Sequence, residues 1–341
     1  MKIGLVGYQS SGKSTLFEWL TGETPDPALA HAAQSAMASV FDDRVAPLCD
    51  IYSPKKVTQA ALEIVDTPGL SRTHEGSAAK LAAIREASCL VIVQAAFGGN
   101  DASVDLSNFD DDLLIADLDI VAGRVERLRE QVKKPRSNRD ELQKELAALE
   151  PLQEALDAGR QLRDLDLSPD QSRAIRSFQL FSEKPRLVIF NISDDEAEPD
   201  QFADQVPAGT ASAALSLTLQ VELARLDDEE RAEICEEMGL AVYDRAALIR
   251  RIMDVSGQML FFTAGEQEVR TWMIRKGGTA VEAAGNIHTD LARGFIRAEV
   301  MQCKDLVELG SEREIKANGL LRQEHKEYVI QDGDILLIRH N

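Results

Sequence analysis

The stretch GYQSSGKST, residues 7–15, decides the fold of this chain. It satisfies the pattern G-x-x-x-x-G-K-[S/T], in which Gly7 and Gly12 let the backbone curl until successive N–H groups point at phosphate oxygens. The apolar run KIGLVG precedes the stretch, and TLFEWLTG follows it as a helix with a glycine stop. The order strand, glycine-rich loop, helix is typical of a P-loop nucleotide-binding domain.

The loop supplies the first set of predicted ligands. Lys13 is expected to reach the terminal phosphates and the Ser14 hydroxyl to bind Mg²⁺, while the helix that begins here adds the positive end of its dipole. Lys13 is therefore also a candidate catalytic residue. The predicted nucleotide-binding residues of the loop are Gln9, Ser10, Ser11, Gly12, Lys13, Ser14 and Thr15.

A second motif, ALEIVDTPGL, occupies residues 61–70. Asp66 ends an apolar strand, where P-loop proteins place the carboxylate that holds Mg²⁺. Gly69 supplies an N–H that is free to approach a γ-phosphate, which makes it the second candidate catalytic residue. Because hydrolysis releases such a loop in switch proteins, the motif favours a nucleotide-dependent switch. A P-loop kinase, the alternative, would need an acceptor pocket and would leave DTPGL unexplained.

A third motif, RLVIFNISDD at residues 186–195, concerns the base. In guanine readers a strand ends in N-K-x-D, and the Asp faces the two donors of guanine. Here the corresponding residues are Asn191, Ile192, Ser193 and Asp194, so the Asn and the carboxylate are present and the Lys is absent. The spacing alone leaves ATP and GTP both open.

Apolar runs typical of buried strands recur along the chain and alternate with helical or loop stretches. They predict an α/β fold with a mostly parallel sheet that is covered on both faces. These runs are KIGLVG near the start, 61–66, 89–95, 186–191 and 211–219.

Near residue 112 the pattern changes to steps of four and three, the seam of a coiled coil. The seam consists of Leu114, Leu118, Val121, Val125, Leu128 and Val132, followed by Leu142, Leu146, Leu149 and Leu156. It predicts an antiparallel helical hairpin over 113–160, inserted in the sheet domain, with Pro151 kinking or restarting the second helix. Two ordinary surface helices packed on the sheet are the alternative.

Charge is distributed unevenly. The chain has a formal net charge of −20, which argues against broad nucleic-acid binding, and no DNA partner is expected. Residues 124–139 nevertheless hold seven Lys or Arg against two Glu, a net charge of +5. This basic segment is either a solvated face or a contact for the phosphates of ribosomal RNA.

Other features bound the class of protein. The four cysteines are widely separated, which predicts reduced thiols instead of disulfides or a zinc site. No apolar run approaches the length of a membrane span, and MKIGLVG leads directly into a strand, so we expect no membrane partner, no signal peptide and a cytoplasmic protein. Short strands with turn residues after about residue 257 predict a separate small α+β domain.

The sequence resembles the YchF-type, Obg-like ATPases, a branch of the translation-factor class of P-loop NTPases. The resemblance covers nearly the whole chain and is most specific in the segments FFTAGEQEVRTWMIRKGGTAVEAAGNIHTDLARGFIRAEV (261–300) and YVIQDGDILLIRHN (328–341), which are similar to that family's TGS-type β-grasp domain. It implies a nucleotide-binding domain at 1–112 and 176–256, a helical insert at 113–175 and a TGS-like domain at 257–341. It also implies association with ribosomes and translation control.

The resemblance further implies that ATP is preferred to GTP, with adenine contacted by the Asn191 side chain and the Ile192 backbone. The chain departs from the family at several positions. Asp194 stands where members carry Glu, and the segment PALAHAAQSAMASVFDDR offers Ser35 but no Thr to Mg²⁺. Leu70 follows Gly69, so no Gln positions water, and the family's catalytic histidine is missing from FGGNDASVD.

Two functions from different classes follow from these patterns. The first is a slow Mg²⁺-dependent ATPase or GTPase whose hydrolysis toggles contact with the ribosome. The second is a binding module in which nucleotide is a regulatory ligand that is never hydrolysed. The missing switch residues are the sequence support for the second.

Overall fold

The computed structural model describes residues 1–341 except 30–31, 73–76, 136, 195–198 and 239–241. The described residues pack as two compact units. The P-loop unit consists of Met1–Ala36 and Glu63–Tyr243, and the C-terminal unit consists of Met37–Leu62 and Asp244–Asn341. The division into a nucleotide-binding domain, an insert and a TGS-like domain stays a prediction, and residues 37–62 pack outside the unit to which it assigns them.

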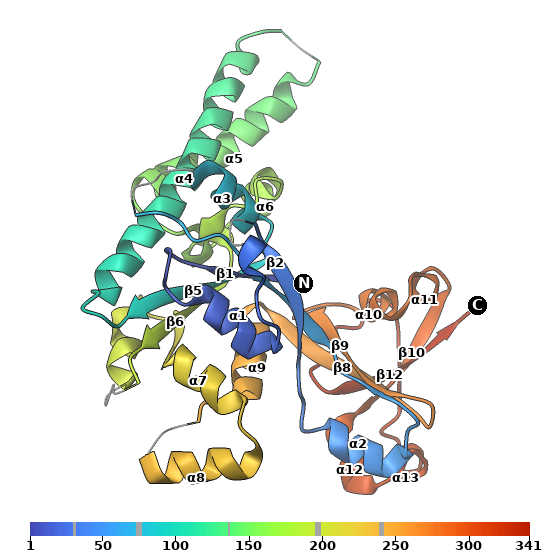
Figure 1. Ribbon diagram of the computed structural model, residues 1–341. Coiled ribbons are helices and arrows are strands. Elements are labelled where there is room, and N and C mark those ends of the chain that lie inside the picture. The colour runs from blue at the N-terminus through green and yellow to red at the C-terminus, as the bar shows by residue number, and fades with distance from the viewer. Residues whose placement is uncertain (30–31, 73–76, 136, 195–198, 239–241) are drawn as a thin grey trace. The chain divides into compact units, whose positions relative to one another are not determined.

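The first sheet contains the P-loop strand at its centre (Figure 1). Its strand order is β2-β4-β1-β5-β6-β7, and the pairs β1–β4, β1–β5, β5–β6 and β6–β7 are parallel. Every residue of β6 is buried, and only the last residue of β5 is not. The expected α/β fold with a parallel sheet is confirmed. The strands are β1 (Lys2–Val6), β2 (Gln34–Ser39), β4 (Ala61–Asp66), β5 (Cys89–Ala96), β6 (Arg186–Ile192) and β7 (Ala211–Leu215).

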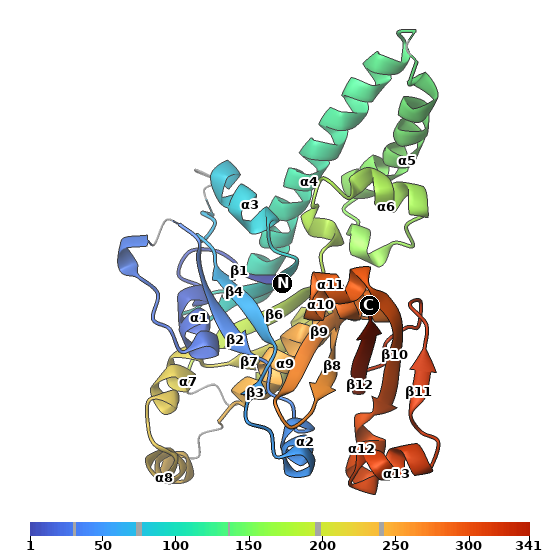
Figure 2. The ribbon, with the colours of Figure 1, turned by 90° about the vertical axis from the view of Figure 1, so that its right-hand side faces the viewer.

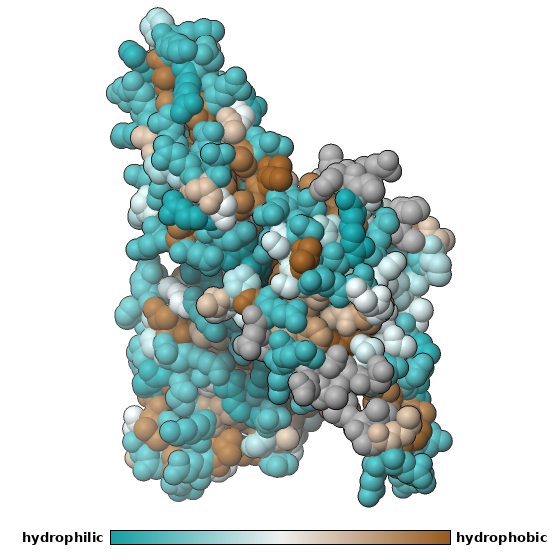
Figure 3. Space-filling model, turned by 90° about the vertical axis from the view of Figure 1, so that its left-hand side faces the viewer, coloured by the Kyte–Doolittle hydropathy of each residue, from teal (hydrophilic) through white to brown (hydrophobic). Residues whose placement is uncertain are grey.

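The helical hairpin consists of α4 (Ala102–Val132) and α5 (Arg139–Asp157), which lie side by side in Figures 1 and 2. The predicted seam is the core between them: Leu114, Val121, Val125, Leu128, Leu142, Leu149 and Leu156 are buried together. Figure 3 shows that the outer surface of the hairpin is mostly hydrophilic on the face in view. The hairpin is therefore held by one apolar seam.

Two details of the hairpin differ from expectation. The first helix begins at Ala102, not at residue 113, because its first turns carry Leu106, Phe109 and Leu113, which pack against the sheet. The two expected arrangements thus coexist in one helix, whose first half covers the sheet and whose second half pairs with α5. Pro151 lies inside α5, which runs without interruption from Arg139 to Asp157, so the predicted restart there is wrong.

The C-terminal unit is built on a second sheet, ordered β11-β10-β12-β8-β9-β3 (Figure 2). Its neighbours β8–β9 and β10–β12 are antiparallel, whereas β12–β8 and β3–β9 are parallel. Strands form in this part of the chain, as expected. In the final run, residues 328–341, only residues 334–340 form a strand. The strands are β3 (Val57–Thr58), β8 (Gln258–Ala264), β9 (Val269–Arg275), β10 (Phe295–Gln302), β11 (Arg322–Glu324) and β12 (Asp334–His340).

Residues 37–62 complete this unit. Val45 and Leu48 of α2 (Val45–Tyr52) are buried in one apolar cluster with Phe262 and Val269. The Asp42 carboxylate forms ion pairs with Arg44 at 2.8 Å and Arg250 at 3.3 Å. Arg44 also forms an ion pair with Asp332 at 2.6 Å. An edge strand, a helix and the buried Asp42 carboxylate of this unit therefore come from a segment far away in sequence.

The remaining helices are distributed over the two units. In the P-loop unit they are α1 (Lys13–Thr21), α3 (Ser77–Arg85), α6 (Pro169–Ile175), α7 (Leu217–Ala224) and α8 (Asp228–Met238), with short 3₁₀ turns at Pro27–Leu29, Leu162–Asp164, Phe181–Glu183 and Pro199–Gln205. In the C-terminal unit they are α9 (Arg245–Val255), α10 (Ala280–Ile287), α11 (Thr289–Arg293), α12 (Cys303–Leu309) and α13 (Glu312–Ala317). Among the described residues, no helix combines the length and apolarity needed to cross a membrane. All four cysteines are free thiols.

Candidate functional site

The phosphate loop connects β1 to α1 and is held from two sides. Gly12 precedes the helix with a φ of 105°, a left-handed conformation that an L side chain rarely adopts. A Cβ at this position would also collide with the Asn191 amide. Glycine is therefore required at residue 12 by both conformation and space. Gln9 and Ser10 are exposed on the outer side of the loop, and Thr15 is half-buried.

Lys13 is buried in the loop with only 6% of its surface exposed. Its ammonium donates to the Tyr8 carbonyl oxygen over 2.7 Å. Burial lowers the pKa of Lys13 to about 8, and the nearby Asp66 carboxylate opposes that shift only in part. A buried cation with so little negative charge around it is well suited to receive phosphate oxygens.

Ser14 and Asp66 form the predicted metal pair. The Ser14 hydroxyl donates to Asp66 Oδ2 over 2.6 Å, and Asp66 Oδ1 is buried without a hydrogen-bond partner. Burial also raises the pKa of Asp66. No group of three His, Cys, Asp or Glu residues in the described parts of the chain could hold a metal by itself. These two oxygen ligands fit Mg²⁺, which proteins commonly bind with one or two side chains plus substrate phosphates.

Gly69 lies directly against the loop. The Gln9 N–H donates to the Leu70 carbonyl over 3.0 Å, and the Leu70 N–H donates to the Gly7 carbonyl over 3.1 Å. A Cβ on Gly69 would lie 2.8 Å from Lys13 Nζ and 2.9 Å from the Gln9 backbone. The DTPG segment thus closes over the lysine that is expected to hold the terminal phosphates.

Asn191 of β6 is hydrogen-bonded both to the phosphate loop and to the start of α7. Its amide nitrogen donates to the Ser11 carbonyl over 3.2 Å, and its amide oxygen accepts from the Leu217 N–H over 3.1 Å. Asp194 is exposed and accepts a hydrogen bond from the hydroxyl of Ser216, which caps α7. The Ile192 side chain is buried in the core. Asn191 therefore contacts the phosphate loop, whereas Asp194 contacts the cap of α7 and Ile192 lies in the core, and Ser216 is a partner that no sequence motif indicated.

A cavity of about 260 Å³ adjoins the metal pair and is lined by Ser14, Thr15, Glu18, Pro25, Asp26, Pro27 and Gln34. Ser11, which is 2% exposed, has a hydroxyl with no hydrogen-bond partner inside the loop. Ser35, the expected stand-in for a switch threonine, lines a different cavity together with Lys2 and Glu63. The structure thus brings the loop residues, Asp66 and Gly69 together, but not Ser35.

Tyr8 is a functional contact that motif spacing did not predict. Its hydroxyl donates to Asp112 of α4 over 3.0 Å, and its ring meets Phe109 edge-on with centroids 5.4 Å apart. The Arg72 guanidinium lies 5.0 Å from the Tyr8 ring centroid and pairs with Asp105 of α4 at 2.5 Å. The aromatic residue inside the loop was the only signal in the sequence. Through it, the helix of the hairpin contacts both the phosphate loop and the segment after Gly69.

A buried polar network also joins α3 to α4. Asp117 is fully buried, pairs with Arg85 at 3.0 Å, and accepts from both the N–H and the hydroxyl of Ser182 at 2.7 and 2.8 Å. Lys184 nearby donates to the Arg85 and Ala87 carbonyls, and burial lowers its pKa to about 8. The end of the helix that follows the DTPG segment is thereby fixed to the hairpin.

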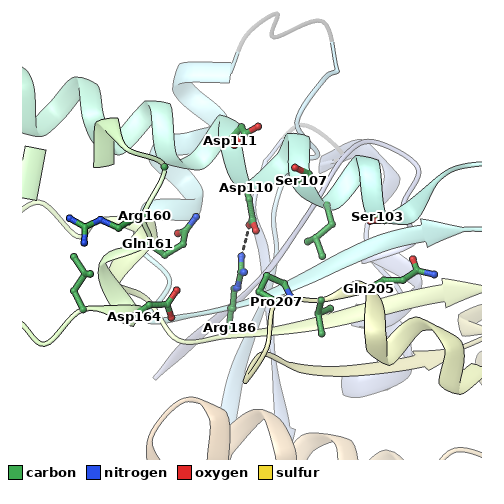
Figure 4. A pocket seen from close by; sticks show the side chains of 14 residues that line it. Ser103, Ser107, Asp110, Asp111, Arg160, Gln161, Asp164, Arg186, Gln205 and Pro207 are labelled. Carbon is green, nitrogen blue, oxygen red and sulfur yellow. Dashed lines mark hydrogen bonds and ion pairs between the residues drawn. The ribbon is translucent and has the colours of Figure 1, made fainter. Parts of the chain in front are cut away.

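A larger cavity, of about 690 Å³, lies at the start of β6, beside the first half of α4 (Figure 4). Arg186 points into its floor and pairs with Asp110, while Ser107, Asp164 and Gln205 lie around it. None of the predicted nucleotide-binding residues lines this cavity. It is therefore separate from the phosphate site.

Comparison with known families agrees with this geometry. Residues 2–121 match the family described as "50S ribosome-binding GTPase". Residues 259–341 match the C-terminal domain family of YchF GTPases, described as "Protein of unknown function (DUF933)". Together the two matches include the phosphate loop, Asp66, Gly69 and most of the second sheet.

Individual proteins are similar over the full chain. The ribosome-binding ATPase YchF of Escherichia coli O157:H7 is 32% identical over 98% of this chain and 98% of its own. The Obg-like ATPase 1 of Oryza sativa subsp. japonica is 34% identical over 100% of this chain and 92% of its own. The solved structure of the Schizosaccharomyces pombe YchF GTPase superposes with a TM-score of 0.86 at 28% identity, covering 99% of this chain and 97% of that one. This chain therefore belongs to the YchF family of Obg-like P-loop NTPases.

Proposed function

We propose that this protein binds ATP with Mg²⁺, hydrolyses it slowly to ADP and phosphate, and acts as a ribosome-associated regulator of translation or stress in the cytoplasm. The observation that carries the proposal is the convergence of Lys13, Ser14, Asp66 and Gly69 at one point of the loop. GTP is the alternative nucleotide. The relatives named above include both ATPases and a GTPase.

Each residue of the loop has a defined role in this proposal. Lys13 would bind the oxygens of the terminal phosphates, and the backbone N–H groups of residues 9–15 would hold the others. Ser14 and Asp66 would hold Mg²⁺, which supplies positive charge against the phosphates when bound. The Gly69 N–H would orient the γ-phosphate. Because phosphoryl transfer depends on positioning and charge, these groups are sufficient for slow hydrolysis.

The second candidate is a module that binds nucleotide without turnover. One observation favours it: Leu70, at the position after Gly69, is 2% exposed and has no polar group with which to orient water. A single-turnover measurement with Mg²⁺-ATP, in the presence and absence of ribosomes, separates the two candidates. Phosphate release that ribosomes accelerate supports the ATPase. Bound ATP that stays intact under both conditions supports the binding module.

We predict that the nucleotide-free protein binds Mg²⁺-ATP at least about tenfold more tightly than Mg²⁺-GTP, a difference of about 1.4 kcal/mol. The reason is that the Asp194 carboxylate already accepts from Ser216, while the Lys of a guanine-reading motif is replaced by Ile192. Calorimetric titration measures both affinities. Asp194→Ala should leave ATP binding unchanged. Tighter GTP binding that is lost in Asp194→Ala would show that this carboxylate reads guanine.

The proposed contact with ribosomal RNA uses the basic segment 124–139. Part of its charge is neutralised within the hairpin, since Arg124 pairs with Glu145 at 2.7 Å and Arg129 with Glu150 at 2.8 Å. Within the described part of the chain, Lys133 pairs with its exposed neighbour Glu130 at 2.6 Å, a weak surface contact. The available cations thus concentrate toward the turn between the helices. Arg136 of this segment lies outside the described residues.

We therefore predict that the triple variant with Lys133→Glu, Lys134→Glu and Arg136→Glu co-sediments with ribosomes at least about tenfold less than the wild-type protein at moderate salt. Arg160→Glu, an exposed charge reversal beyond the other end of α5, is the matched control. Loss should be measured at two salt concentrations, because a phosphate contact weakens steeply as salt rises. Unchanged sedimentation of the triple variant would exclude the basic segment as the ribosome contact.

A further inference from the structure

Lys80 on α3 is a second cation at the phosphate site. Its ammonium donates to the Gly69 carbonyl oxygen over 2.9 Å. A Cβ built on the same glycine would lie 2.8 Å from Lys13 Nζ. Two ammonium groups therefore lie close to Gly69, one from the phosphate loop and one from the helix after the DTPG segment.

Such a pair of like charges is unfavourable unless an anion lies near both. Lys80 and Lys13 both approach Gly69, so their positive charges repel each other. Asp66 is the carboxylate that acts on Lys13, and its Oδ2 is already bonded to Ser14. Within the described part of the chain, Lys80 has no carboxylate partner of its own. The charge balance at Gly69 therefore favours a multiply charged anion between the two ammonium groups.

The position of Lys80 specifies which part of the anion it faces. Lys13 is expected to reach the terminal phosphates, and Gly69 is the residue expected to face the γ-phosphate. A cation bonded to the Gly69 carbonyl is therefore on the γ-phosphate side of the site. Lysine carries its charge on a flexible stem, so the Lys80 ammonium can exchange the carbonyl for another acceptor within its reach.

We propose that Lys80 binds the γ-phosphate and stabilises the charge that develops on it during hydrolysis, which rests on the proposed NTPase function. This role differs from that of a water-positioning side chain, which the buried Leu70 does not supply. A positive charge that is supplied within the same chain acts on the transferred phosphoryl group as arginine fingers do.

Three substitutions separate this role from a structural one. Lys80→Met removes both the charge and the hydrogen bond to Gly69. Lys80→Gln removes the charge but keeps a donor, and Lys80→Arg keeps both. Lys144→Met, at an exposed lysine of α5, is the matched control. Each variant is titrated with Mg²⁺-ADP and with a non-hydrolysable Mg²⁺-ATP analogue, and single-turnover hydrolysis of ATP is measured alongside.

We expect Lys80→Met and Lys80→Gln to bind the ATP analogue about tenfold more weakly than the wild-type protein while binding ADP equally well. Turnover should fall by about 10²- to 10³-fold in both, and Lys80→Arg should recover most of each loss. If Lys80→Gln behaves as the wild type, Lys80 acts only by holding Gly69 and the inference is wrong. Equal loss of ADP and analogue, or no loss, also overturns it.

The same measurements separate this inference from the proposed function. A wild-type protein that binds neither nucleotide overturns both. A wild-type protein that hydrolyses ATP, with Lys80 variants that match it, overturns only the role of Lys80. If the wild type binds nucleotide but does not hydrolyse it, the ATPase fails, and the difference between analogue and ADP affinities still decides whether Lys80 binds the γ-phosphate.

Discussion

Lys13→Ala is expected to weaken the binding of Mg²⁺-ATP by at least about a hundredfold, or about 2.7 kcal/mol. The ammonium is the one buried cation inside the loop, and in the free protein its hydrogen-bond acceptor is the Tyr8 carbonyl at 2.7 Å. Alanine removes every bond that this group could make to the terminal phosphates. Calorimetric titration of the variant and of the wild-type protein measures the difference.

The same substitution should not destabilise the free protein. Burial lowers the pKa of Lys13 to about 8, which means that the folded loop disfavours this charge. Removing it should therefore leave the thermal midpoint of the nucleotide-free protein unchanged or higher. Lys144→Ala serves as a control for the loss of an exposed lysine. A midpoint that falls by several degrees together with affinity would mean that Lys13 maintains the loop itself and that the binding loss is indirect.

Asp117→Ala is expected to lower the free energy of unfolding of the P-loop unit by about 3–5 kcal/mol. The carboxylate is fully buried and bonded to Arg85 and to two groups of Ser182. Its removal takes the carboxylate from the partly buried Arg85 guanidinium and leaves the buried Ser182 N–H without this acceptor, at a point where α3 and α4 meet. Asp119→Ala, two residues later on the exposed side of the same helix, should change stability by less than about 0.5 kcal/mol.

Unfolding of this unit can be followed by itself because the chain contains two tryptophans, Trp19 in the P-loop unit and Trp272 in the C-terminal unit. In a Trp272→Phe background, urea unfolding monitored by fluorescence reports on Trp19, which is 4% exposed. Midpoints and slopes of the two aspartate variants are then compared. Equal midpoints for Asp117→Ala and Asp119→Ala would show that the buried ion pair contributes little net stability.

The parts of the fold that were predictable depend on short-range patterns. The glycine spacing of the loop, the fully apolar strands and the seam of the hairpin each report a local constraint, so they appear in the sequence at fixed intervals. Residues 12 and 69 must be glycine for a steric reason, because a Cβ at these positions would meet Asn191 or Lys13. These constraints were sufficient to locate Lys13, Ser14, Asp66 and Gly69.

The remainder depends on pairings between distant segments. The apolar positions of α4 indicated a buried face but not its partner, and that partner changes from the sheet to α5 along one helix. Likewise, nothing near Tyr8 or Lys80 in the sequence indicates that the first contacts Asp112 and the second Gly69. Such contacts arise only when the sheet has brought the segments together.

The C-terminal unit combines an early and a late segment of the chain, and this affects how it can fold during synthesis. Residues 37–62 are made early, but the core that takes up Val45 and Leu48 is completed by Phe262, Val269 and Ile335. Every residue of the segment Glu63–Tyr243 must leave the ribosome before that core can close. During translation the early segment therefore exposes apolar side chains for most of the synthesis time. A fragment that begins at residue 257 would lack these side chains and leave the edge of β9 open to other strands.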